Sequence, residues 1–225
     1  MEFDKLAGKY VGDTASRYDA TRDRAPKWNR EQEEIGKILR TLRSGSTIVD
    51  IPVGTGRFLE LYAELGLRAT GLDISTSMLD ESRAKAASLG ISVELRPADI
   101  RAINAQDGTF DTALCVRFLN WVDLDGFRAA LRELTRVART DLVITVRHYA
   151  PLADLERDLG GAVRLAKQVV RRVRKRFAKP GLVFHEKRQV LRSFETLGLQ
   201  VVSSACLERR WDGTDYFVYH LRKTR

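Results

Sequence analysis

Residues 47–57 read Thr-Ile-Val-Asp-Ile-Pro-Val-Gly-Thr-Gly-Arg, and the apolar-periodic stretch Phe58–Leu65 follows them. A β-branched run, an aspartate and a glycine turn that opens into such a stretch predict a strand, a turn and a helix in that order. In α/β proteins this turn lies at the carboxyl end of a parallel strand, where the backbone can approach a ligand closely. The stretch therefore predicts the ligand-binding edge of a parallel sheet.

Two further aspartates come at the ends of later strand-like runs. Asp73 closes the run Leu67–Leu72, and Asp99 follows the run Ile91–Leu95. We expect both carboxylates to join the glycine turn in a nucleoside pocket. Asp73 would accept hydrogen bonds from a ribose, and Asp99 together with Ile100 would face an adenine. A helix N-cap is the alternative role for Asp73.

A dinucleotide-binding Rossmann domain is the nearest competing interpretation, because an acidic residue about 20 positions after a glycine turn also serves NAD. That motif requires a third glycine where the helix packs on the strand. The matching position is Leu59, which weakens the NAD interpretation. The phosphate-loop pattern Gly-x-x-x-x-Gly-Lys-Ser/Thr is absent from the sequence.

At these residues the chain resembles the class I S-adenosylmethionine (SAM)-dependent methyltransferases, particularly the ubiquinone/menaquinone C-methyltransferase-like group. Asp50–Gly56 matches the family motif Asp-x-Gly-x-Gly-x-Gly, with Pro52 in place of the first glycine. The resemblance continues through Gly71–Ser75, Ala98–Ile100 and Phe110–Val116, and covers roughly residues 8–148. It implies that the protein is an enzyme and that SAM is its cofactor.

The cofactor-binding residues that we infer lie in an N-terminal arm, in the glycine turn and at the strand ends. They are Tyr10, Arg17, Tyr18, Asp50, Pro52, Gly54, Thr55, Gly56, Arg57, Asp73, Ile74, Met78, Asp99, Ile100 and Val116. Residues 10–19 look like the family's cap motif Phe-Asp-x-x-Ala-x-x-Tyr-Asp, which in relatives folds over the cofactor. The alternative is that the aromatic residues of this arm only pin an N-terminal helix to the sheet.

Strand and helix patterns alternate along the chain and predict an α/β fold, a Rossmann-like doubly wound sheet. The predicted strands are 47–51, 68–72, 91–96, 110–116 and 141–147, and the predicted helices are 28–42, 57–65, 76–89, 124–138 and 186–197. Leu199–Leu207 and Tyr216–Leu221 read as a final hairpin. The resemblance implies a mainly parallel seven-stranded sheet with an antiparallel C-terminal strand.

The 225 residues fit one methyltransferase domain, with an N-terminal helical cap over about 1–42 and a basic helical insertion over about 152–179. Neither a signal-peptide run nor a run of about 20 apolar residues occurs, so we expect a cytoplasmic protein. Cys115 and Cys206, the two cysteines, are expected to be reduced thiols.

The net charge of +9 is concentrated in residues 162–179, which carry eight basic residues and no acid. Its apolar residues recur at steps of three and four, so the segment predicts a basic amphipathic helix. Such a helix could lie peripherally on an anionic membrane or form part of a site for an acidic substrate.

For chemistry we expect His148 and His185 as candidate general bases near the carboxyl edge of the sheet, with a purely structural role as the alternative for each. Arg117, Asn120, Trp121 and Tyr149 are the expected acceptor-binding residues. Carboxylates with metal-ligand spacing are lacking, and we therefore expect no metal.

These features predict SAM-dependent methyl transfer to a small-molecule or lipid- or glycan-linked acceptor, with transfer to oxygen slightly favoured. An RNA methyltransferase that uses the basic helix as a phosphate clamp is one alternative. The localised charge and the lack of a separate RNA-binding module make nucleic acid the weaker choice. A SAM-binding or membrane-associated protein without catalytic activity is the other alternative.

Overall fold

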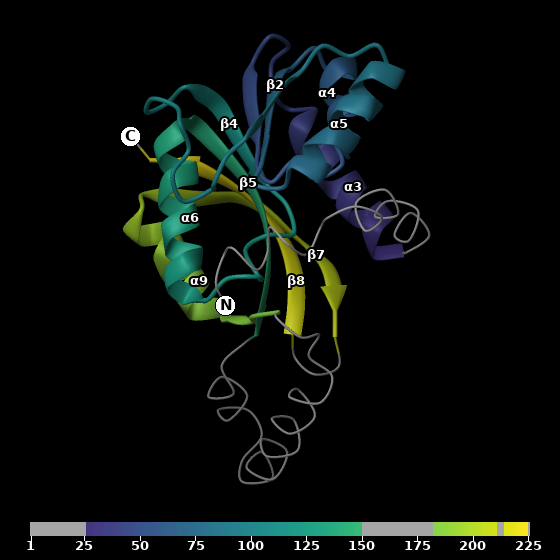
Figure 1. Cartoon of the computed structure of the whole chain (residues 1–225). Coiled ribbons are helices and arrows are strands. Elements are labelled where there is room, and N and C mark those ends of the chain that lie inside the picture. Colours follow the sequence, from purple (N-terminus) through teal and green to yellow (C-terminus); the bar gives the residue numbers. More distant parts are fainter. Residues whose placement is uncertain (1–25, 150–181, 211–213, 225) are drawn as a thin grey trace, which may run out of the picture.

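The structure, a computed structural model, describes residues 26–149, 182–210 and 214–224. Within these ranges the chain forms an eight-stranded sheet of order β3-β2-β1-β4-β5-β8-β7, with β6 paired to β5 (Figure 1). The strands are β1 (Thr47–Asp50), β2 (Arg68–Asp73), β3 (Glu94–Pro97), β4 (Phe110–Cys115), β5 (Ala138–Tyr149), β6 (His185–Glu186), β7 (Leu199–Arg209) and β8 (Thr214–Lys223).

Strands β1 to β5 run parallel to one another, and β8 runs antiparallel to β5 and to β7. The chain first builds outward from β1 to β3 and then returns to place β4 on the other side of β1. Strand order therefore reverses at β1, and ligands of open α/β sheets bind outside the carboxyl ends of the strands at such a reversal.

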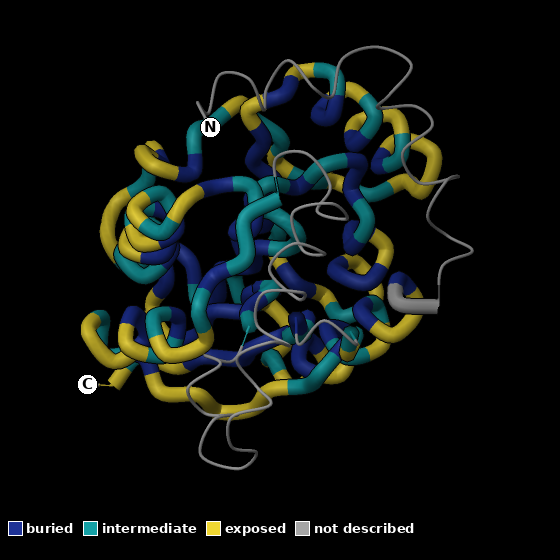
Figure 2. Tube along the Cα trace, turned by 90° about the horizontal axis from the view of Figure 1, so that it is seen from below, coloured by how far each residue is buried: buried dark blue, intermediate teal, exposed yellow. Residues whose placement is uncertain are grey.

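Helices cover both faces of the sheet (Figure 1). One face carries α3 (Pro26–Leu39), α4 (Leu59–Glu64) and α5 (Thr76–Ser88), and the other carries α6 (Leu124–Val137) and α9 (Lys187–Thr196). Buried segments run through the middle of the molecule, and exposed segments lie at its periphery (Figure 2). No helix in the described ranges is long and apolar enough to cross a membrane.

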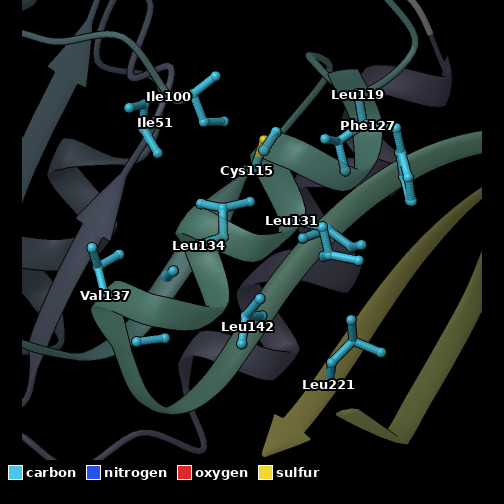
Figure 3. Close-up of a cluster of buried hydrophobic side chains, with 14 of the residues drawn as sticks. Ile51, Ile100, Cys115, Leu119, Phe127, Leu131, Leu134, Val137, Leu142 and Leu221 are labelled. Carbon is cyan, nitrogen blue, oxygen red and sulfur yellow. The ribbon is translucent and has the colours of Figure 1, made fainter. Parts of the chain in front are cut away.

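Helix α6 shows how the sequence pattern builds the core. Its buried residues follow the helical period, and they are Phe127, Ala130, Leu131, Leu134 and Val137. Their side chains pack against Cys115 of β4, Leu142 of β5 and Leu221 of β8 (Figure 3). Asp123 caps the helix by accepting a hydrogen bond from the Gly126 N–H at 2.9 Å. The period and the cap together fix which face of α6 meets the sheet.

The predicted alternation, the parallel sheet and the antiparallel C-terminal strand are confirmed. Two predictions were incomplete. Strand β5 is longer than the predicted 141–147, because Ala138 at the end of α6 already adopts an extended conformation and the strand continues to Tyr149. The eighth strand was not predicted, since β6 is only two residues long and pairs with the far end of β5.

Candidate functional site

A pocket lies at the carboxyl ends of β1, β2 and β4, on the edge that the reversal in strand order predicts. Its lining comes from α3, the glycine turn and the segments that follow β2 and β4. The lining residues are Trp28, Asp50, Pro52, Val53, Gly54, Thr55, Arg57, Phe58, Asp73, Ile74, Ser75, Met78, Val116, Arg117, Phe118 and Trp121. Most of the predicted cofactor residues among the described ones therefore line the same pocket.

The turn requires glycine at its two glycine positions for different structural reasons. Gly54 has a φ of +59°, and a Cβ placed on it would meet nothing within 4 Å, because this residue faces the pocket. Gly56 has a φ of +75°, and a Cβ there would lie 2.6 Å from Leu59 Cδ1 and 2.9 Å from Ser82 Oγ. Gly54 thus lets a ligand approach the backbone. Gly56, a predicted cofactor residue, instead lets α4 and α5 pack closely against the turn.

Asp73 links the turn to the next strand. Its Oδ2 accepts a hydrogen bond from the Gly54 N–H and its Oδ1 accepts one from the Ser75 N–H, both at 2.9 Å. Ser75, not Asp73, caps α5, because its Oγ accepts a hydrogen bond from Met78 N. Burial raises the pKa of Asp73. Each carboxylate oxygen has a second lone pair with which to accept a hydroxyl hydrogen bond.

Asp99 and Ile100 line a second, adjoining pocket together with Ile51 and Ala98. Pro52, Ile74 and Phe118 line both pockets, so the two pockets adjoin along the sheet edge. Arg101 Nε donates to both carboxylate oxygens of Asp99 at 3.0 Å, and this side-chain hydrogen bonding lowers the pKa of Asp99. The second pocket extends the first toward β3, as an adenine site next to a ribose site requires.

Asp50 ends β1 beneath the turn and also lines the first pocket. The Tyr62 hydroxyl donates a hydrogen bond to its Oδ2 at 2.9 Å. The pKa of Asp50 is raised to about 7, and burial is the largest cause of this shift. The Ile51–Pro52 peptide bond that follows is cis.

A buried ionic cluster contributes Trp28, Arg57 and Arg117 to the lining of the first pocket. It consists of Trp28, Glu31, Arg57, Arg117 and Tyr216, and we call it the Glu31 cluster. The fully buried Glu31 carboxylate accepts hydrogen bonds from Arg57 Nη1, from Arg117 Nε at 2.6 Å and from the Tyr216 hydroxyl. The Cζ atoms of Arg57 and Arg117 lie 3.7 Å and 4.3 Å from the centroid of the Trp28 ring. The cluster ties α3 and β8 to the pocket.

Arg117 holds an unusual backbone conformation at the end of β4. Its φ is +60°, and no other non-glycine residue in the described part of the chain has a positive φ. The Arg117 N–H donates to Thr145 Oγ1 at 2.8 Å, and this hydrogen bond connects the residue to β5. Such backbone strain is typical of functional sites.

The two candidate bases lie in the core and not on the pocket wall. His148 is within β5 and almost fully buried, its Nε2 lies 2.7 Å from the Tyr219 hydroxyl, and its ring stacks on Phe217. Burial lowers its pKa to about 4. His185 is also buried, with Nε2 2.8 Å from the Leu119 carbonyl oxygen and a pKa lowered by burial. The described contacts of both histidines are structural.

The four predicted acceptor residues divide into two pairs. Arg117 and Trp121 line the first pocket, and Asn120 and Tyr149 do not appear in its lining. The Asn120 amide is used for bracing: Nδ2 donates to the carbonyl oxygens of Arg147 and Val183, and Oδ1 accepts from the Arg147 N–H. Tyr149 pairs with Glu186 at the end of β5. The observed contacts of Asn120 brace the backbone, and its predicted substrate role stays a prediction.

Several residues of the pocket and of the Glu31 cluster were not predicted from the sequence, namely Trp28, Glu31, Phe58, Phe118 and Tyr216. One feature of the sequence indicated that Glu31 is paired. It stands on the apolar stripe of α3, three residues after Trp28 and four before Ile35, where a carboxylate must be paired if the stripe is buried. The predicted lid residues Tyr10, Arg17 and Tyr18 and the basic segment 162–179 lie outside the described residues.

Comparisons with known proteins agree with the geometry of the pocket. A family model described as "Methyltransferase domain" matches residues 48–141. Ubiquinone biosynthesis O-methyltransferase from Methylocella silvestris is 32% identical over 93 residues, which are 41% of this chain and 36% of that protein. Malonyl-(acyl-carrier protein) O-methyltransferase from Serratia marcescens is 31% identical over 116 residues, 50% of this chain and 43% of that protein. The chain thus spans less than half the length of these curated relatives.

A solved structure is similar over almost the whole chain. Magnesium protoporphyrin IX methyltransferase from Synechocystis, with bound S-adenosylhomocysteine (SAH), has a TM-score of 0.74 at 13% identity and covers 99% of this chain and 100% of that one. At this identity the likeness concerns the fold alone.

Residues 48–141 match the methyltransferase domain model, and the fold is that of solved methyltransferase structures with bound S-adenosyl-L-methionine (SAM) or SAH. The described residues fit this cofactor: the open space above Gly54 admits a ligand to the backbone, and the carboxylate of Asp73 stands at the pocket wall. Ubiquinone biosynthesis O-methyltransferases are among the curated proteins to which part of the chain is similar.

Proposed function

We propose that this protein transfers a methyl group from SAM to a small-molecule or lipid- or glycan-linked acceptor, with oxygen as the favoured acceptor atom. The observation that carries the proposal is the continuity of the pocket. The glycine turn, Asp73 and the aromatic residues Trp28, Phe118 and Trp121 all line the first pocket. A cofactor and an apolar acceptor can therefore meet within one cavity.

The residues of the cofactor side have separable roles in this proposal. Asp73 accepts hydrogen bonds from the ribose, Asp99 and Ile100 face the adenine, and Asp50 lies near the methionine amino group. The cofactor, when bound, supplies a methyl group on a sulfonium, whose leaving group is already activated. The task that remains for the protein is to hold the acceptor atom in line with that methyl group.

The acceptor side supports alignment better than proton transfer. A general-base role for His148 or His185 would require the acceptor to reach a side chain buried in the core. The rigid Glu31 cluster and the aromatic wall instead offer fixed surfaces against which an acceptor can be oriented. The names of the two relatives above, both O-methyltransferases, support oxygen as the acceptor atom.

Transfer of tritiated methyl from SAM to fractionated lipids, glycans, RNA and small metabolites tests this function. We expect label in the small-metabolite, lipid or glycan fraction, and we expect Asp73→Ala to abolish most of it. Label in RNA would instead favour the alternative in which the basic segment 162–179 clamps phosphates. If SAH binds and no fraction is labelled, the protein is a SAM-binding protein without this activity.

A further inference from the structure

Asp50 is an almost fully buried carboxylate in the lining of the first pocket. The residue is 2% exposed. The Tyr62 hydroxyl donates a hydrogen bond to Oδ2 at 2.9 Å, and no described residue donates one to Oδ1. Buried polar atoms in proteins are nearly always hydrogen-bonded, and a buried carboxylate is costly unless a donor or a cation satisfies it. Asp50 therefore has one oxygen available for a ligand in the pocket.

The titratable groups around Asp50 come from three elements and the glycine turn. Asp73, the last residue of β2, lines the same pocket, and its negative charge disfavours ionisation of Asp50. Arg57 of the turn and the hydrogen bond from Tyr62 of α4 favour ionisation. The Cys115 thiol of β4 stays neutral, because burial and the nearby Asp50 raise its pKa. Two neighbouring carboxylates thus line one pocket, and a cation bound between them is favoured.

Burial outweighs the contacts that favour ionisation, and the pKa of Asp50 is raised to about 7. Near neutral pH the ligand-free protein therefore contains both protonated and ionised Asp50. A cation that binds at Oδ1 favours the ionised form, because an opposite charge at close range lowers the pKa of a carboxyl group. Binding of the cation and loss of the proton are then linked.

We propose that Asp50 binds the ammonium group of the cofactor as a carboxylate and releases its proton to solvent on binding, so that the affinity for the cofactor rises with pH. Oδ1 accepts from the ammonium group while Oδ2 keeps the hydrogen bond from Tyr62. Tyr62 is a positioning residue in this arrangement, because it holds the carboxylate and favours its ionised form. The inference rests on the proposed function, because it concerns the binding of SAM in the same pocket.

Calorimetry on the full chain with SAH at pH 6 and at pH 7.5 tests the inference. The ammonium group of SAH is protonated at both pH values, so the ligand keeps its charge. If only ionised Asp50 binds SAH, a pKa of about 7 predicts an affinity about eightfold lower at pH 6. Titrations at pH 6 in buffers of different ionisation enthalpy should show release of about one proton per bound SAH.

A matched ligand and three variants assign the effect to Asp50. 5′-Methylthioadenosine keeps the nucleoside and lacks the amino-acid end, so its affinity should not change in this way. Asp50→Asn should abolish the pH dependence of SAH binding, because an amide does not titrate. Tyr62→Phe should keep the dependence and move its midpoint to higher pH, since a contact that favours ionisation is lost. The control Asp125→Asn, which changes an exposed carboxylate on α6, should behave as the parent does.

Equal SAH affinity at the two pH values would overturn the inference, and so would a dependence that survives in Asp50→Asn. The same dependence for 5′-methylthioadenosine would also overturn it and would assign the titrating group to the nucleoside end. If Asp50→Asn does not fold, an unshifted midpoint in Tyr62→Phe contradicts the inference by itself. Absence of SAH binding at both pH values would instead contradict the proposed function, so the two failures are distinguishable.

Discussion

The two sides of the pocket are built in different ways. On the cofactor side, contacts join residues that are near in sequence: Asp73 binds the Ser75 N–H two residues away and the Gly54 N–H 19 residues away. On the acceptor side, Glu31 binds Arg117 across 86 residues and Tyr216 across 185 residues. The cofactor side is a local strand-turn-helix product, whereas the acceptor side exists only when the whole chain has folded.

This difference lets the two sides change independently. The cofactor side can keep one geometry, because short segments fix it. The acceptor wall depends on α3 and β8, which lie in distant parts of the sequence, so substitutions there can reshape it without disturbing the glycine turn. Damage to the acceptor side should therefore lower the stability of the fold or the recognition of the acceptor before it alters cofactor affinity.

Replacing Glu31 by Gln gives the largest expected effect. The change leaves two buried guanidiniums without their carboxylate, and breaking a buried ion pair in this way costs about 3–5 kcal/mol of unfolding free energy. Urea denaturation measures this loss of unfolding free energy. Glu33→Gln on the same helix is the control, since Glu33 is 64% exposed and pairs only with Lys37 among the described residues, and surface pairs contribute about 0–1 kcal/mol. Equal effects of the two substitutions would remove the Glu31 cluster as the brace of the acceptor side.

Asn120 tests whether a residue next to the acceptor wall braces it or touches the acceptor. Asn120→Ala removes three hydrogen bonds to part-buried backbone groups, which at about 1 kcal/mol each predicts a loss of roughly 3 kcal/mol in unfolding free energy. SAH affinity should stay unchanged in calorimetry on the folded variant. The exposed Asn104→Ala serves as control. Parent-like stability of Asn120→Ala together with lost methyl transfer would restore the substrate role.

His148 predicts a pH dependence of stability. Its pKa is lowered to about 4 in the folded protein from an ordinary value of 6.5, so below pH 6.5 the unfolded chain binds a proton that the folded protein does not. Stability from this residue is thus complete above pH 6.5 and falls as the pH drops toward 4, by about 2 kcal/mol at pH 5.

The measurement compares the parent with His148→Gln by urea denaturation at pH 7.5 and pH 5. Other groups titrate in both proteins, including Asp50, whose raised pKa has the opposite effect, so only the change in the difference reports on His148. That difference should shrink by about 2 kcal/mol at pH 5. A constant difference would show that the histidine is accessible to protons and would reopen its role as a base.

Local patterns pointed to residues of the glycine turn and the strand ends that line one pocket, and they gave little indication of the Glu31 cluster. Gly54 follows the end of β1 and Asp73 is the last residue of β2, and a few adjacent residues determine the chemistry of a turn or a strand end. Asn120 also follows a strand, yet a polar residue at that position looks the same whether it binds a substrate or braces the backbone. No local sequence pattern pointed to Tyr216, because its partner Glu31 lies on a helix near the other end of the chain.

Calorimetric titration with SAH tests the central claim, that the glycine turn and Asp73 form a SAM site, most directly. The account predicts one binding site in the parent protein, weaker binding in Asp73→Ala by about 1.5 kcal/mol or roughly tenfold, and no comparable binding of NADH. Parent-like SAH affinity in Asp73→Ala would remove the ribose role of that residue. Binding of NADH in place of SAH would contradict the account.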